Sequence, residues 1–213
     1  VIFPPSTEFA TQHGKPEFAH WPIARERYGG NDYTAGVDIS WWKNHNSPVS
    51  FFAWNYTDDW FGGYDHGVQA GTLQVSDHHV APGKKFFEWG VGDEGRVWSE
   101  ILSDTDGPYL ELMAGAWSDN QPDYSWIQPG EVRTWTHYWY PVQNLGGVKN
   151  ANVDAAVNLV ITNRTASVAF NATAYFKDAR AQLLVDGKPL LDHQISISPK
   201  GGLSHTVMLE QNV

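Results

Sequence analysis

The sequence contains no cysteine, and this absence removes several kinds of chemistry at once. Disulfide bonds, a thiolate nucleophile and cysteine-based zinc sites are all excluded. Basic residues are also scarce, since 14 Lys and Arg stand against 24 Asp and Glu and the net charge is −10. Nucleic-acid binding needs a basic stripe that displaces counterions from phosphates, but no basic cluster here exceeds the pair Lys84–Lys85. The charge argues against a nucleic-acid partner and fits a neutral or cationic ligand.

Long apolar runs are missing as well. No segment approaches the roughly 18 apolar residues of a membrane span. The first residues, VIFPPSTEF, lack the charged n-region and the apolar h-region of a signal peptide. The absence of cysteine is compatible with either a cytoplasmic or a secreted location. Helical periodicity is weak throughout. Apolar residues still make up 41% of the 213 residues, enough for one large domain or for a domain with a smaller module.

Alternation of period two, interrupted by turn residues, dominates the chain and predicts an all-β fold. The segments expected to form strands are 37–42, 49–56, 71–80, 84–90, 109–117 and 131–142. Turns are expected at Gly62–Gly63, Pro82–Gly83 and Pro129–Gly130. Residues 92–96, with the sequence GDEGR, are expected to form a loop.

Composition changes after Gly146–Gly147, because Trp disappears beyond Trp139 and short Ala, Val, Leu and Ile alternations follow. About five strands at a spacing of roughly 8–12 residues are typical of a small β-sandwich. The pair Asp186–Gly187 predicts a hairpin turn. We therefore expect two domains, residues 1–148 and an immunoglobulin-like β-sandwich module over residues 149–213.

Between Trp54 and Trp126, aromatic rings alternate with carboxylates, imidazoles and glycines at high density. Such side chains form sugar-binding clefts, because rings cover the apolar faces of a pyranose and polar groups bond its hydroxyls. The loop SDNQPDYSW, which ends this stretch, has an alternative interpretation as a turn that is exposed to solvent and binds no ligand. The predicted ligand is a carbohydrate, and the candidate binding residues are Trp54, Tyr64, Asp77, Glu88, Trp89, Asp119, Asn120, Asp123 and Trp126.

His78 and His79 adjoin in the sequence SDHH. On a strand they would point to opposite faces, so only His79, on the face of Asp77, would enter a cleft. A carboxylate neighbour stabilises an imidazolium, which makes His79 a candidate general acid; the alternative is a structural histidine with satisfied partners. The same divergence argues against a metal site built from these residues. We predict no metal and no cofactor.

His66 and Glu111 are the other candidates for acid–base chemistry. His66 lies in a Gly-flanked loop, where a backbone can approach a ligand closely, or where a histidine is simply exposed to water. Glu111 lies mid-strand between two leucines, and an unpaired ion buried there would cost several kcal/mol. Glu111 is therefore either a structural carboxylate paired with Arg96 or Arg133, or a base facing a cleft.

Four segments carry a family resemblance: WNYTDDWFGGYDHG, VSDHHVAPGKKFFEWG, DGPYLELMAGAWSDNQPDYSWIQPGE and HYWYPV. Over roughly residues 20–155 they resemble a bacterial domain-of-unknown-function family of the galactose mutarotase-like superfamily, often followed by tetratricopeptide repeats. The resemblance implies a β-supersandwich with a carbohydrate cleft on one concave face. The domain of that family is longer at its N-terminus, which implies that further domains or a second chain complete the supersandwich.

Superfamily relatives include aldose mutarotases, which use a His acid and a Glu base, and also polysaccharide lyases and glycoside hydrolases. By motif position, the resemblance points to His66, His79 and Glu111 for such catalytic roles, by analogy of fold. Two hypotheses follow. The protein is either an enzyme that transfers a proton at an anomeric centre or glycosidic bond, or a non-catalytic carbohydrate-binding or scaffold domain of a larger protein.

Overall fold

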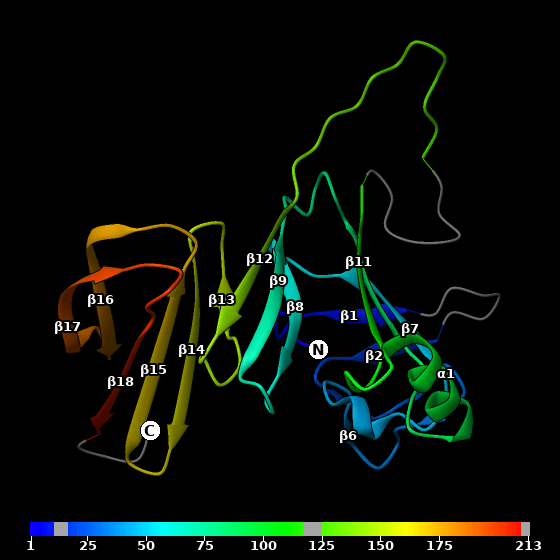
Figure 1. Cartoon of the computed structure of the whole chain (residues 1–213), viewed down its shortest axis with the longest axis horizontal. Helices are drawn as coiled ribbons and strands as arrows, with labels where there is room; N and C mark the ends of the chain where they lie inside the picture. Colours follow the sequence, from blue (N-terminus) through cyan, green and yellow to red (C-terminus); the bar gives the residue numbers. More distant parts are fainter. Residues whose placement is uncertain (11–16, 117–124, 210–213) are drawn as a thin grey trace. The chain divides into compact units, whose positions relative to one another are not determined.

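The computed structural model describes residues 1–10, 17–116 and 125–209 (Figure 1). Within these residues the fold is almost entirely β, which confirms the predicted fold class. Contacts divide the chain into two compact units, Val1–Gly62 with Ser76–His137, and Gly63–Val75 with Tyr138–Val213. No helix in the described ranges is long and apolar enough to cross a membrane.

A five-stranded sheet of order β11-β10-β7-β1-β2 forms the centre of the first unit, and all its neighbours are antiparallel. The strands are β1 (Glu8–Ala10), β2 (Phe18–His20), β7 (Val49–Asn55), β10 (Gly83–Glu88) and β11 (Leu110–Gly115). Two short ladders accompany it, β3 (Ile23–Ala24) with β6 (Val37–Asp38), and β4 (Arg27–Tyr28) with β5 (Asn31–Asp32). A single 3-10 turn, η1 (Trp42–Asn44), precedes β7.

One face of this sheet packs into an aromatic core. Phe51 on β7 stacks on both Tyr28 and Phe86, with ring centroids 4.5 Å apart in each pair. Phe9 on β1 meets Phe51 and Phe86 edge-on. Stacked and edge-on pairs of buried rings each add about 0.5–1.5 kcal/mol beyond the burial of their area. The stack therefore joins the three central strands from one side.

The other face of the sheet carries the alternate residues of the same strands. Lys85 on β10 lies opposite Phe52 on β7 and Met113 on β11, and its Nζ is 4.8 Å from the centre of the Phe52 ring. Phe87 lies opposite Ser50 and Glu111 in the next row. Since successive strand residues point to opposite faces, Lys84 and Lys85 are separated by the sheet.

Helix α1 (Asp93–Ser103) replaces the loop expected at residues 92–96. Asp93 and Glu94 lie in its first turn, where carboxylates favour the helix dipole. Trp98, one turn further, stacks on Trp89 with ring centroids 4.8 Å apart. Gly95 made the segment look like a loop, but it is a buried helix residue that packs on the backbone of Gly90.

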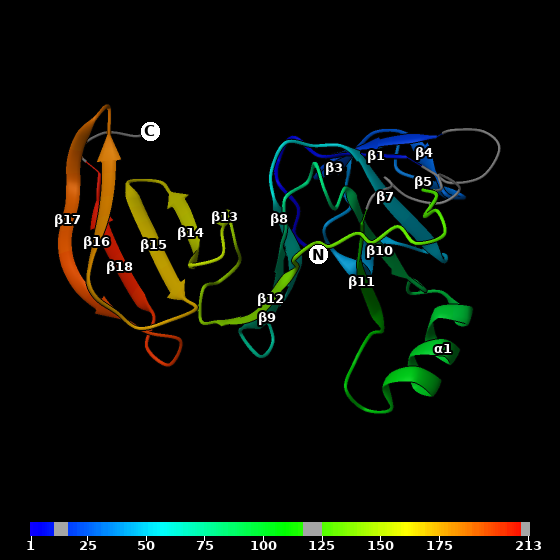
Figure 2. The same cartoon turned by 90° about the horizontal axis from the view of Figure 1, so that it is seen from above.

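The second unit contains three groups of strands (Figure 2). A sheet of order β12-β9-β8 contains β8 (Trp60–Asp65, which begins in the first unit), β9 (Ala70–Val75) and β12 (Tyr138–Gln143). A second sheet contains β13 (Asn150–Ala151), β14 (Ala155–Thr162), β15 (Thr165–Ala172) and β18 (Leu203–Met208). The hairpin of β16 (Phe176–Val185) and β17 (Lys188–Ile197) turns at Asp186–Gly187 as predicted, with φ of +50° and +76°.

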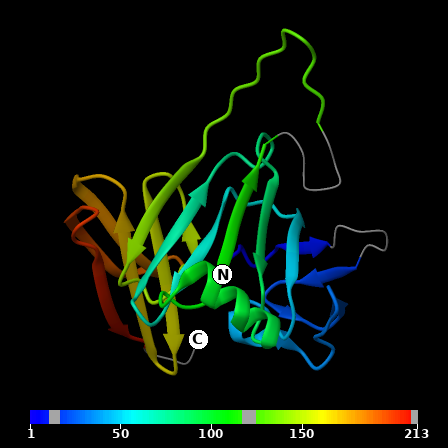
Figure 3. The same cartoon turned by 45° about the vertical axis from the view of Figure 1, so that its right-hand side comes forward.

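Four further local predictions are wrong. The strand expected over residues 37–42 is limited to Val37–Asp38, and the chain then turns into η1 at Trp42. Gly62 and Gly63 lie inside β8 rather than in a turn. The strand expected over residues 71–80 ends at Val75, because the carbonyl of Asp77 accepts the N–H groups of Val80 and Ala81 and closes a turn there. The run 131–142 is a strand only from Tyr138, as the trace before β12 in Figure 3 shows.

The contact of Gly95 with Gly90 gives a test of the fold. A Cβ on Gly95 would lie 1.8 Å from the Gly90 carbonyl oxygen. Alanine favours helices over glycine by about 1 kcal/mol, yet we expect Gly95→Ala to lower the free energy of unfolding by about 1–3 kcal/mol through overpacking. Urea denaturation measures it, with Glu100→Ala on the exposed side of α1 as the control. A Gly95→Ala protein as stable as the parent would contradict this packing.

Candidate functional site

The residues predicted to form the sugar site fall in both units. Tyr64 and His66 belong to the second unit, whereas His79 and Glu111 belong to the first. Asp119, Asn120 and Asp123 lie outside the described residues.

The Tyr64 hydroxyl accepts the N–H groups of Leu145 and Gly146 at 3.1 and 2.9 Å and donates to Gln69 at 3.1 Å. These bonds give Tyr64 a structural role inside its own unit. The ring of His66 lies in the turn after β8, 5.0 Å from the Tyr64 ring.

His79 and Glu111, the predicted acid and base of the first unit, are not brought together. Glu111 lies opposite Phe87 at one end of β10, while His79 precedes Gly83 at the other end. At about 3.3 Å per residue, Gly83 and Phe87 alone are roughly 13 Å apart. Glu111 accepts a hydrogen bond of 2.9 Å from the Tyr109 hydroxyl, which raises the pKa of Tyr109. The two arginines considered as its partners bind Asp93 and Glu131 instead.

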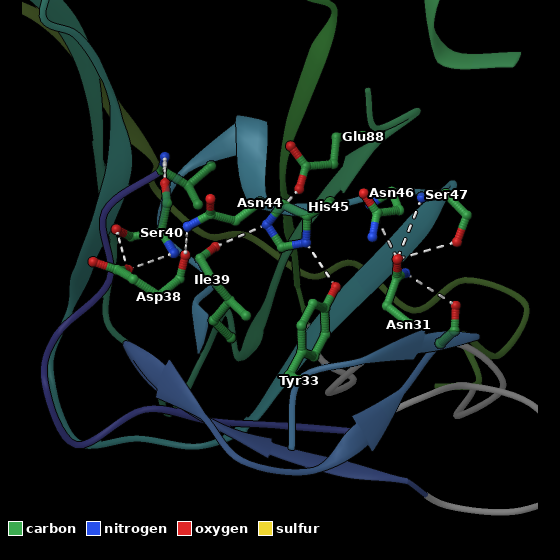
Figure 4. Close-up of polar contacts among 12 residues, drawn as sticks. Asn31, Tyr33, Asp38, Ile39, Ser40, Asn44, His45, Asn46, Ser47 and Glu88 are labelled. Atoms are coloured by element: carbon green, nitrogen blue, oxygen red, sulfur yellow. Dashed lines mark hydrogen bonds and ion pairs between the residues drawn. The ribbon is translucent and has the colours of Figure 1, made fainter. Parts of the chain in front are cut away.

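Glu88 lies in the core, beside the buried imidazole of His45 (Figure 4). His45 Nδ1 accepts the Tyr33 hydroxyl at 2.7 Å, and Nε2 donates to the carbonyl of Ile39 at 3.1 Å. Glu88 Oε1 lies 2.8 Å from the same Nε2, but that N–H points to Ile39, so the oxygen has no aligned donor. This network holds the segment before β7 against the sheet. Trp89, which follows Glu88 and was also predicted to bind the carbohydrate, is half-buried and stacks on Trp98.

The turn after β9 gathers a second group of polar residues, the histidine cluster, defined as Asp59, Asp77, His78, His79 and Lys84. The rings of His78 and His79 lie 3.9 Å apart, so they are adjacent rather than opposed as a strand would place them. Asp59 Oδ1 lies 2.7 Å from His78 Nδ1 and also accepts the His78 backbone N–H at 2.9 Å. Asp77 Oδ1 accepts the His79 N–H at 2.9 Å.

Lys84 is the fully buried cation of this cluster. Its Nζ donates to the Asp58 carbonyl at 2.8 Å and lies 4.4 Å from the centre of the Tyr56 ring. Burial lowers the pKa of Lys84 to about 8, although the charges of Asp59, Asp58 and Asp77 oppose the shift. A lysine with such a pKa exchanges its proton close to neutral pH, which is typical of functional sites.

The outer face of β2, β1 and β7 carries an exposed pair of rings. Phe18 and Trp54 are 44% and 51% exposed, with ring centroids 5.6 Å apart. A chain of polar groups runs beside them, because Asn55 Nδ2 donates to Glu8 at 2.9 Å and His20 Nε2 lies 3.6 Å from Glu8. We call Phe18, Trp54, Glu8, His20 and Asn55 the ring face. Glu26 continues the chain, 2.7 Å from His20 Nδ1.

Trp54 alone among these five residues was predicted from the sequence. Asn55 is the last residue of β7. The other three come from two three-residue strands on either side of residues 11–16, in the segments EFA and FAH. The signal that was available is their period of two, since Phe9 and Ala19 are buried while Glu8, Phe18 and His20 are partly or fully exposed. A shift of register between Glu8 and Phe9 brings Glu8 opposite Asn55. Three-residue alternations are too short to stand out locally.

Trp126 lies in a loop of residues 125–133 that is closed by its own side chains. Pro129 and Gly130 form the predicted turn, with Gly130 at a φ of +82° and the Glu131 N–H donating to the Gln128 carbonyl at 2.9 Å. Arg133 donates to Ser125, Trp126 and Glu131 across the loop. Trp126 itself is 79% exposed.

Lys84 makes the stability of the protein depend on pH. Its pKa of about 8 in the folded state lies below the ordinary 10.5, so between these values the unfolded chain holds a proton that the folded chain has released. The free energy of unfolding should therefore rise with pH in this window, by at most about 1.4 kcal/mol per unit. We expect Lys84→Met to remove this rise and Lys85→Met to keep it. Urea denaturation between pH 7.5 and 9.5 measures both, and parallel curves for Lys84→Met and the parent would disprove the assignment.

Comparison with known proteins matches residues 2–142 to DUF5107, described as a domain of unknown function, and residues 150–213 to the second domain of YphG-like proteins. One similar solved structure is a TPR-domain containing protein from Parabacteroides distasonis ATCC 8503, with 21% identity and a TM-score of 0.49. The match covers 66% of this chain, which spans 22% of the length of that protein. Because the first match covers well over half of the sequence, the chain belongs to the DUF5107 family.

Proposed function

We propose that this protein binds a carbohydrate on the ring face of its first unit, as a non-catalytic module. The observation that carries the proposal is the exposed pair of Phe18 and Trp54 beside the polar chain of Asn55, Glu8 and His20. An aromatic surface covers the apolar C–H face of a pyranose, and fixed donors and acceptors beside it bond the hydroxyl groups of the sugar. We further propose that the protein adopts the galactose mutarotase-like supersandwich fold and that its partners are further domains or a second chain.

The rings supply the apolar part of the binding energy. Trp54 and Phe18 pack on each other while about half of each remains exposed to water. Covering about 100 Å² of this surface with the C–H face of a sugar would contribute roughly 2.5 kcal/mol at 25 cal/mol per Å². Ordering of the ligand offsets part of that gain. Each ring is therefore expected to change affinity by about tenfold.

The polar chain supplies orientation and limits the kind of sugar. Glu8 is already held by Asn55 and lies near His20, and His20 is held by Glu26. Groups that are positioned before binding lose less conformational freedom when a hydroxyl bonds to them. Two carboxylates beside the rings, in a protein of net charge −10, favour a neutral or amino sugar over an acidic one.

Binding without turnover is favoured by the positions of the predicted acid and base. Proton transfer requires groups within hydrogen-bond reach of the reacting atoms. His79 and Glu111 lie toward opposite ends of β10, so one pyranose ring does not reach both. A catalytic role for His66, His79 and Glu111 stays a prediction, and a glycan screen that is scored for product formation tests it.

A glycan screen scored for both binding and product formation tests the proposal, followed by calorimetry on the sugars that bind. We expect Trp54→Ala and Phe18→Ala to weaken binding about tenfold or more, because each removes one ring of the pair. Trp41→Ala is the matched control, since Trp41 is 42% exposed and lies in the same unit beside Lys43. Binding that Trp41→Ala and Trp54→Ala reduce equally would refute the ring face as the site.

Two further variants separate the alternatives. Loss of binding in Trp126→Ala, with Trp54→Ala unaffected, would move the sugar to the loop of residues 125–133. Product formed by the parent protein and lost in both His79→Ala and Glu111→Gln would establish catalysis and overturn the non-catalytic assignment. We expect neither outcome.

A further inference from the structure

We propose that the histidine cluster is a binding site for a divalent transition-metal ion, with Asp77, His78 and His79 as ligands and Zn²⁺ as the ion that fits. One ligand atom from each of these residues lies within 4.8 Å of the other two. Within the described ranges this is the one such group of three or more His, Asp and Glu residues. The proposal is independent of sugar binding on the ring face.

The turn after β9 is what brings the ligands together. On a strand the two histidines would diverge, and that expectation led us to predict no metal. Because β9 ends at Val75 and the backbone turns at Asp77, the two imidazoles lie side by side at 3.9 Å. Two imidazoles and one carboxylate are the ligands of many zinc sites that keep a position open for water.

Asp59, which is outside the three ligands, orients His78 for this role. Its Oδ1 lies 2.7 Å from His78 Nδ1, and an imidazole that donates from Nδ1 presents the lone pair of Nε2. Metal-binding histidines almost always donate their second ring nitrogen to such a carboxylate or carbonyl.

The charge of the cluster also favours a divalent cation. Asp58, Asp59 and Asp77 all act electrostatically on the one ammonium group of Lys84. The two carboxylates of the cluster, the neighbouring carboxylate of Asp58 and the one ammonium give a local charge of about −2 when the imidazoles are neutral. A bound divalent ion would balance this charge.

Only small movements would complete the coordination. Donor atoms around a tetrahedral zinc ion lie about 3.3 Å apart, given bonds of about 2.0–2.1 Å. Asp77 and His79 are exposed, so their side chains can rotate inward without disturbing the core. Half-buried His78 stays in place on Asp59. Imidazole ligands favour Zn²⁺ and Co²⁺ over Ca²⁺ and Mg²⁺, which prefer oxygen ligands.

Titration calorimetry with Zn²⁺, and visible absorption with Co²⁺ as the spectroscopic probe, test the proposal on the full chain. We expect one equivalent to bind with a dissociation constant in the micromolar range, and no saturable heat from Ca²⁺. His79→Ala, which removes an exposed ligand, should weaken Zn²⁺ binding more than tenfold. Asp59→Asn should weaken it about 10–100-fold, as removal of an outer-shell partner usually does.

The pair His193–His205 provides the matched control, since its rings also lie close together, 5.0 Å apart, in the second unit. We expect His205→Ala to bind Zn²⁺ as the parent does. Equal affinity in His79→Ala and the parent, or loss of binding in His205→Ala alone, would overturn the proposal, as would absence of binding up to millimolar Zn²⁺. Trp54→Ala should bind Zn²⁺ normally, which keeps this outcome separate from that of the sugar screen.

Discussion

The stack of Tyr28, Phe51 and Phe86 is the interaction on which the first unit depends. With Phe51 against Phe86 at 4.5 Å, the register of β10 on β7 is fixed, and a slip by one residue would exchange the two faces of β10. Lys84 and Glu88 therefore point to the inner side and Lys85 to the outer side. The buried amine, the buried carboxylate beside His45 and the outer face of the sheet all follow from this one alignment of rings.

The sequence was sufficient for the features that are written in local patterns. The all-β class, the hairpin at Asp186–Gly187 and the turn at Pro129–Gly130 follow from periodicity and turn chemistry. Helix α1 was not predicted because a glycine at position 95 indicates a loop when only its neighbours in sequence are considered. The structure requires a glycine there because the helix packs closely on the backbone of Gly90. The turn at Asp77 was missed because strand-like alternation continues through it.

The candidate sites were predictable only in part, for a related reason. Trp54 stood out because its neighbours in sequence are aromatic and acidic. Its companion Phe18 and the Glu8–Asn55 bond come from pairing across tens of residues, which depends on the register of β1. The sequence SDHH stood out as a motif, but the positions of its imidazole rings did not follow from it. Adjacent side chains point to opposite faces on a strand, whereas in this turn they lie side by side.

One stretch of six residues, Trp54–Asp59, contributes to both proposed sites, through Trp54 and Asn55 on the ring face and Asp59 in the histidine cluster. The region matched to the DUF5107 family, residues 2–142, also supplies the β12-β9-β8 sheet of the second unit. Tyr64 on β8 binds the backbone at Leu145, whose carbonyl accepts Asn158 of β14. The chain therefore crosses between its compact units at residues 62–63, 75–76 and 137–138. The boundary between the two matched regions, at residues 143–149, therefore lies inside the second compact unit rather than between the two units.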